Sequence, residues 1–119
     1  MPYSLYHNPR CSKSRQALAL LQEREIELEV IEYLAHPPSD ATLSRLVELL
    51  GLPAKHLVRT KESSFKDLGL NIDDLAKDEV ISLLVQHPKL IERPIFTTDD
   101  QAVIGRPPEN VLGLLDQRQ

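Results

Sequence analysis

Cys11 is the only cysteine in this chain of 119 residues, and a single thiol cannot form an internal disulfide. An unpaired thiol is typical of proteins in a reducing compartment, so we expect a cytoplasmic protein. Long apolar runs are also missing, because no segment approaches the roughly 20 apolar residues that a membrane-spanning helix needs. Residues 1–5 lack the basic start and the apolar stretch of a secretory leader. We therefore expect a protein that is neither secreted nor associated with a membrane.

Positive charge is scarce as well, since 14 lysines and arginines face 18 acidic residues and the formal net charge is −4. This balance argues against nucleic acid as a partner, because non-specific binding to phosphates needs a basic surface. The four glycines are isolated, so there is no glycine-rich phosphate loop. The four histidines lack the spacing of metal ligands, and one cysteine does not complete a thiolate-rich metal site. We expect neither a metal ion nor a bound organic cofactor.

The apolar pattern predicts strands and helices in an α/β order. Alternation and turn residues predict strands at residues 3–7, 26–34, 95–98 and 102–104, and helical periodicity predicts helices at 12–24, 40–50, 53–58, 64–68, 78–86 and from 108 onward. The first strand–helix–strand unit requires a parallel pair with a right-handed crossover, and the last two strands form a hairpin. We predict a single α/β domain over residues 1–119, with a four-stranded mixed sheet flanked by helices and an all-helical insertion at about residues 39–92.

The same patterns predict which side chains face the core and where one helix begins and ends. Ser39 is expected to cap the 40–50 helix, and Gly51 to end it. In the second strand, Ile26, Leu28 and Val30 alternate with acidic residues. Helical spacing places on buried faces Val80, Ile81, Leu84 and Val85, and later Val111, Leu112 and Leu115.

Cys11 follows a predicted strand and precedes a predicted helix, so it is expected at a helix N-terminus. The free backbone N–H groups and the positive end of the helix dipole favour a thiolate there, and the thiolate is the reactive form of cysteine. Arg10, Lys13 and Arg15 add three positive charges without an acidic residue among them. The alternative is a buried cysteine that acts as a small hydrophobic residue. The polar sequence around Cys11 favours a reactive thiol.

Ser14 stands where the second cysteine of a C-x-x-C redox motif would stand. Its hydroxyl could donate a hydrogen bond to the thiolate, or it could satisfy a backbone group in the first helical turn. A serine cannot resolve a disulfide, so redox chemistry at Cys11 would need a thiol from glutathione or a partner protein.

Other polar residues could complete a site around the thiol. His7 and Asn8 lie just before Cys11, where His7 could tune the thiolate, relay a proton or only form a local hydrogen bond. Arg59, Arg93 and Arg106 carry planar donor groups suited to tetrahedral oxyanions, although a single arginine is more often a solvated surface charge. Arg93 and Arg106 each precede a proline, which restricts their backbone.

The segment Tyr-His-Asn-Pro-Arg-Cys-Ser-Lys-Ser-Arg at residues 6–15 resembles the active-site loop of the glutaredoxin-coupled arsenate reductase family. The resemblance continues through Tyr33-Leu34, Pro37-Pro38, Leu57-Val58-Arg59, Leu68-Gly69-Leu70, His87-Pro88, Ile91-Glu92-Arg93-Pro94-Ile95 and Gly105-Arg106-Pro107. It implies a thioredoxin-like fold and places this chain near a shorter subgroup of that family. This combination of motifs is far more specific than any one of them.

The resemblance also implies roles for individual residues. Cys11 would attack the arsenic of arsenate, and His7 would support its thiolate. The oxyanion would be held by Arg59, Arg93 and Arg106, and the supporting residues would be Asn8, Ser14, Arg15 and Pro94, with a cis peptide bond between Arg93 and Pro94. Glutathione as co-substrate and glutaredoxin as partner protein would deliver the electrons, without a bound cofactor.

Two other functions fit parts of the sequence. One is a related single-cysteine thiol oxidoreductase with another substrate, such as a glutathione mixed disulfide. Compared with longer members of the family, this chain has added charge at Arg10 and Lys13 and a shorter C-terminus. Both differences are compatible with another substrate. The second is a Spx-type transcriptional regulator, which shares this scaffold and binds RNA polymerase. Two features favour an enzyme over a regulator. Many such regulators carry a second cysteine where this chain has Ser14, and they typically lack the match at Gly105-Arg106-Pro107.

Overall fold

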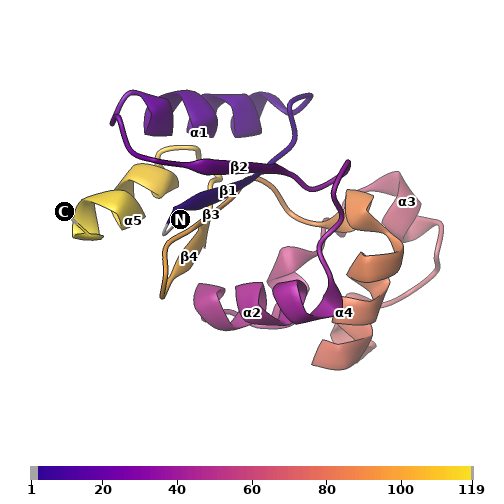
Figure 1. Cartoon of the computed structure of the whole chain (residues 1–119). Coiled ribbons are helices and arrows are strands. Elements are labelled where there is room, and N and C mark those ends of the chain that lie inside the picture. The colour runs from indigo at the N-terminus through magenta and orange to yellow at the C-terminus, as the bar shows by residue number, and fades with distance from the viewer. Residues whose placement is uncertain (1–2, 119) are drawn as a thin grey trace. The chain divides into compact units, whose positions relative to one another are not determined.

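The computed structural model describes residues 3–118 and divides the chain into two compact units (Figure 1). The first unit combines the N-terminal segment up to His36 with the C-terminal segment from Arg93 onward, and the second comprises Pro37–Glu92. The second unit corresponds closely to the insertion expected at residues 39–92, while the assignment of the whole chain to one domain stays a prediction. Within the described residues, no helix combines the length and apolar character that crossing a membrane requires.

The first unit contains a four-stranded mixed sheet, which confirms the predicted fold class. Its strands are β1 (Ser4–His7), β2 (Glu29–Glu32), β3 (Ile95–Thr97) and β4 (Ala102–Ile104), in the order β2-β1-β3-β4. β1 and β2 are parallel, whereas β3 is antiparallel to both β1 and β4. The parallel pair follows from the helical crossover between β1 and β2, and the antiparallel pair follows from the short turn between β3 and β4.

One face of this sheet is covered by α1 (Ser12–Gln22) and α5 (Asn110–Arg118). Leu5 and Phe96 are register partners, so both side chains point to the same face. They form a buried cluster with Ala17, Leu21, Val111, Leu114 and Leu115. Each fully buried Leu or Phe side chain stabilises the fold by roughly 1.5–3 kcal/mol. This packing holds the start of α1 next to the end of β1, where Cys11 lies.

The second unit is built from helices and helical turns. It contains α2 (Asp40–Leu50), α3 (Ser63–Lys66), α4 (Lys77–Gln86) and 3-10 turns at Ala54–Leu57, Ile72–Asp74 and Pro88–Leu90, with an isolated bridge between Val58 and Ile91. Both predicted ends of α2 are confirmed. The Ser39 hydroxyl accepts a hydrogen bond from the Thr42 N–H at 3.2 Å, and Gly51 adopts a left-handed conformation with φ of 66°.

Several local predictions were wrong, and the exposure of the side chains explains them. The second strand is shorter than predicted and lies at the edge of the sheet, so Val30 is 41% exposed. Val85 is 40% exposed because it borders an open pocket between α2 and α4. Leu112 is half-buried but packs against the core cluster, on the buried side as predicted. The 3-10 turns at 72–74 and 88–90 were not predicted, since single turns carry no apolar period.

Candidate active site

A tight turn between β1 and α1 positions Cys11. The Cys11 N–H donates to the Asn8 carbonyl at 3.0 Å, and the Arg10 N–H donates to Asn8 Oδ1 at 3.0 Å. Cys11 has extended backbone geometry and is the N-cap of α1, and its carbonyl accepts the first helical hydrogen bond from the Arg15 N–H at 3.0 Å. The thiol therefore lies beside the free N–H groups of the first turn of α1. Its side chain is half-buried, which excludes the alternative of a cysteine sealed in the core.

Arg106 contacts the thiol directly, although 95 residues separate it from Cys11 in the sequence. Its Nη1 lies 3.9 Å from Cys11 Sγ and donates to the Arg93 carbonyl at 3.3 Å. Two cis peptide bonds, Arg93–Pro94 as expected and Arg106–Pro107 in addition, shape this side of the site. The exposed Arg106 guanidinium keeps donors that a bound anion could use. The structure thus brings Cys11, the Arg106 guanidinium and the Arg93 carbonyl together.

Behind the thiol, the buried Ser14 hydroxyl joins His7 to the turn. Ser14 Oγ lies 2.6 Å from His7 Nδ1 and accepts a hydrogen bond from the Asn8 N–H at 3.0 Å. Of the two roles considered for Ser14, this geometry favours bonding to a backbone group, although that group is the Asn8 N–H in the turn before α1 and not one in the first helical turn. The same hydroxyl also fixes the imidazole.

Burial lowers the pKa of His7 below its usual value of 6.5. Glu32, which pairs in register with His7 on β2, acts in the opposite direction, and the positive charge of Arg15 lowers the pKa further. A neutral imidazole accepts a hydrogen bond through its unprotonated nitrogen. The arrangement that satisfies all groups has the Ser14 O–H donating to Nδ1, with the remaining proton on His7 Nε2.

The other predicted residues fall into two groups. Arg15 closes the turn, because its Nη1 donates to the Pro9 carbonyl at 2.9 Å. Arg59 belongs to the second unit, where its guanidinium pairs with Glu62 at 2.8 Å and its N–H donates to the Leu90 carbonyl at 2.8 Å. A part for Arg59 in the site stays a prediction.

Two residues hold the Arg106 loop in place: Gly105, whose motif was noted but whose packing role was not predicted, and Asn110, which was not predicted at all. The Gly105 N–H donates to the Pro94 carbonyl at 2.8 Å, and a Cβ at Gly105 would come within 2.8 Å of Pro94 Cγ and 3.1 Å of Val111 Cγ1. Asn110 Nδ2 lies 3.3 Å from the carbonyl oxygens of both Ile104 and Arg106. A glycine directly before the arginine, and an asparagine at a helix start, were the available signals.

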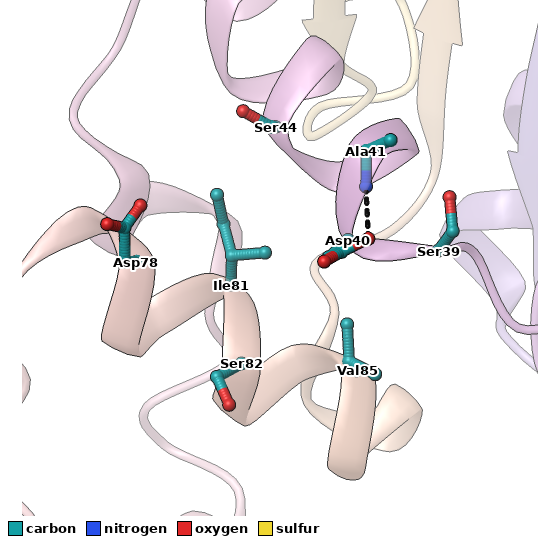
Figure 2. Close-up of a pocket in the computed structure, with 8 residues that line it drawn as sticks. All are labelled: Ser39, Asp40, Ala41, Ser44, Asp78, Ile81, Ser82 and Val85. Carbon is teal, nitrogen blue, oxygen red and sulfur yellow. Dashed lines mark hydrogen bonds between the residues drawn. The ribbon is translucent and has the colours of Figure 1, made fainter.

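A pocket elsewhere in the molecule has a different character. It lies in the second unit between α2 and α4, has a volume of about 710 Å³ and is lined by Ser39, Asp40, Ala41, Ser44, Asp78, Ile81, Ser82 and Val85 (Figure 2). Its lining contains no cysteine, histidine or basic side chain. Within residues 3–118, no group of three or more His, Cys, Asp or Glu residues is arranged to hold a metal ion. The candidate active site is therefore the Cys11 turn with Arg93 and Arg106.

Comparison with known proteins agrees with this choice. The model of the ArsC family matches residues 6–114, which include every residue placed in the turn and the Arg106 loop. The chain belongs to the ArsC family. Its predicted membership of the arsenate reductase family is thereby confirmed.

Relatives of this ArsC-family protein match nearly its whole length. An arsenate reductase from Neisseria meningitidis serogroup A is 44% identical over 112 residues, which is 93% of this chain and 96% of that protein. The uncharacterized protein YfgD of Escherichia coli K12 is 47% identical, with 93% and 94% of the two chains covered. The solved structure of an arsenate reductase from Vibrio cholerae superposes with a TM-score of 0.88 at 46% identity, covering 93% of this chain and 95% of that one. The thioredoxin-like fold is therefore shared with these proteins.

Proposed function

We propose that this protein reduces arsenate to arsenite, with Cys11 as the nucleophile and with glutathione and glutaredoxin as the sources of electrons. The observation that carries the proposal is the contact between Arg106 Nη1 and Cys11 Sγ at 3.9 Å, at the N-terminus of α1. This contact puts an anion-binding group beside a nucleophile. The names of the relatives from Neisseria and Vibrio supply the anion, arsenate.

The first step forms a covalent bond between sulfur and arsenic. The Cys11 thiolate attacks arsenic, an arsenic–oxygen bond breaks, and the oxygen leaves as water after it takes up protons. Donors from Arg106, which lies beside the sulfur, would stabilise the negative charge on the remaining oxygens. Arg93 accepts from Arg106 through its carbonyl, and its own role in oxyanion binding is proposed from the sequence resemblance. Arg59 is retained as a predicted oxyanion-binding residue on the sequence resemblance alone.

The following steps reduce the arsenic with two external thiols, since Ser14 cannot supply one. Glutathione forms a second sulfur–arsenic bond, and another oxygen leaves as water. A glutaredoxin thiolate then attacks the glutathione sulfur, and the electron pair of that sulfur–arsenic bond stays on arsenic, which passes from As(V) to As(III). Water cleaves the last sulfur–arsenic bond and releases arsenite and the Cys11 thiol. Thiols supply both electrons, so the proposed cycle uses no resident cofactor and fits the glutathione-rich cytoplasm.

His7, Ser14 and Asn8 act behind the sulfur in this proposal. The neutral His7 ring is held by Ser14, and Ser14 in turn holds the Asn8 N–H at the start of the turn. Rigid support of this kind keeps the sulfur in position for attack. Correct positioning of a nucleophile lowers the activation barrier by more than the net energy of the few hydrogen bonds that hold it. We therefore propose that His7 and Ser14 position Cys11.

The test is arsenate-dependent oxidation of NADPH in an assay coupled through glutathione, glutaredoxin and glutathione reductase. Cys11→Ser is expected to abolish turnover, whereas Ser12→Ala, a change at the exposed neighbouring residue, is expected to retain it. Turnover by the Cys11→Ser variant would remove this residue from the mechanism. Wild-type protein that leaves arsenate unreduced but reduces a glutathione mixed disulfide would replace the proposal with the alternative thiol oxidoreductase.

The contribution of Arg106 can be measured in the same assay. Arg106→Ala is expected to lower kcat/KM for arsenate about 100-fold, because one well-placed donor to a developing anion contributes on that order. Arg106→Lys keeps the charge but loses the planar fork, so an intermediate loss is expected. Equal kcat/KM for wild type and Arg106→Ala would exclude this arginine from oxyanion binding.

A further inference from the structure

Three exposed basic residues lie within four positions of Cys11 in the sequence, and we call them the basic rim: Arg10, Lys13 and Arg15. No acidic residue occurs between Asn8 and Ala17, although acidic residues outnumber basic ones in the whole chain. Among the residues that the structure describes, none of the three pairs with a carboxylate. The basic rim is therefore a local positive patch on a protein whose net charge is −4.

The basic rim is separate from the residues that face the oxyanion. Arg106 reaches the sulfur from the loop after β4, whereas Arg10 precedes Cys11 in the turn, and Lys13 and Arg15 lie in the first turns of α1. Arg15 is fixed by its hydrogen bond to the Pro9 carbonyl, so its charge stays at the turn. An anion held at Arg106 and a second negatively charged molecule attracted by the basic rim would therefore meet different side chains.

The chemistry of a single cysteine requires such a second molecule. An adduct on Cys11 can be resolved only by a thiol from outside the chain, and that thiol must reach the sulfur or the atom bound to it. We propose that the basic rim selects small thiols that carry carboxylates over neutral thiols, and that Arg10 and Lys13 determine this selectivity. The inference rests on the proposed function, because it concerns the thiol that renews Cys11.

A reaction without arsenate tests the selectivity on its own. Cys11 is first converted to its mixed disulfide with pyridine-2-thiol, a neutral leaving group. An incoming thiolate attacks the Cys11 sulfur, the sulfur–sulfur bond breaks, and pyridine-2-thione leaves with the electron pair and a proton and is followed by its absorbance. Glutathione, which carries two carboxylates and one ammonium group, is compared with 2-mercaptoethanol, whose thiolate is its only charge, at low ionic strength.

The Arg10→Gln/Lys13→Gln double variant is expected to react with glutathione roughly fivefold more slowly than wild type. The 2-mercaptoethanol thiolate carries only one negative charge, so its rate should fall clearly less. Added salt should shrink the difference, because these charges are exposed and screened. Arg24→Gln is a control for the loss of positive charge away from Cys11, since Arg24 lies just beyond the far end of α1 and pairs with Asp116, and it should leave both rates unchanged.

Two outcomes would overturn the inference. In one, both thiols slow equally in the double variant, which would mean that the basic rim acts on the sulfur and not on the incoming thiol. In the other, neither rate changes. Because the reaction contains no arsenate, a protein that fails to reduce arsenate can still show this selectivity, and the two proposals are judged separately.

Discussion

Replacing Ser14 by alanine is expected to destabilise the protein by about 2 kcal/mol. The Ser14 side chain is completely buried, and its oxygen makes two hydrogen bonds, to His7 Nδ1 at 2.6 Å and from the Asn8 N–H at 3.0 Å. Each intramolecular hydrogen bond contributes roughly 1 kcal/mol net, and a partner left unsatisfied in the interior costs at least as much. The methyl group of alanine fills the Cβ position, so the loss comes from the hydroxyl and not from packing.

Thermal unfolding followed by circular dichroism near neutral pH measures this loss. For a chain of this length, 1 kcal/mol corresponds to roughly 4 °C, so Ser14→Ala should lower Tm by about 8 °C. Ser12→Ala is the matched control, because Ser12 is exposed and lies two residues away in the same helical turn. A control change within about 0.5 kcal/mol is expected at such a surface position.

The reasoning fails if Ser14→Ala unfolds at the same temperature as wild type. That result would mean that the hydroxyl is not engaged with His7 and Asn8, and the support proposed for the Cys11 turn would go with it. Equal losses in both serine variants would point instead to a general sensitivity of the α1 N-terminus.

Three further predictions concern the pH, the Arg106 loop and the core. Burial lowers the pKa of His7 below 6.5, so the unfolded chain binds the proton first as the pH falls. The stability present above pH 6.5 is therefore lost as the pH falls through the lowered pKa. Urea unfolding between about pH 7 and 5 should show a weaker loss of stability for His7→Asn than for wild type, and parallel curves would contradict this. Gly105→Ala should lower both Tm and kcat/KM for arsenate, because the new Cβ would meet Pro94 Cγ at 2.8 Å. Gly113→Ala is the control, since a Cβ there meets nothing within 4 Å and neither quantity should fall. Equal Tm values for wild type and Gly105→Ala would show that the loop accommodates the methyl group without loss of stability. Leu115→Ala in the buried cluster should cost about 2–5 kcal/mol in urea unfolding, and a loss below about 1 kcal/mol would mean that α5 is not anchored there.

Much of the site and fold could be predicted because local chemistry is strong in a few segments. The turn before Cys11 is specified by Asn-Pro-Arg, and the ends of α2 by Ser39 and Gly51, all of which act within a few residues. The mixed sheet followed from one rule about crossovers and one about hairpins. These features need no knowledge of distant parts of the chain.

Side-chain partners were harder to predict because they depend on how helices and strands pack against one another. Ser14 was considered a donor to the thiolate, and its observed partner His7 depends on how α1 packs against the end of β1. The exposure of Val30 and Val85 depends on which neighbour covers them, and an apolar residue carries no sign of that. The two glycines with positive φ, in contrast, both end helical turns, as expected of glycine.

The sequence by itself determined that there is one thiol, that it follows a strand and begins a helix, and that basic residues surround it, because these properties belong to neighbouring residues. Only the tertiary structure decided that Arg106 reaches that thiol from 95 residues away, and that Gly105 leaves room for Pro94 beside it. Such contacts depend on the order of strands in the sheet and on close packing, which arise only when distant segments are brought together. The chemistry proposed for Cys11 depends on both.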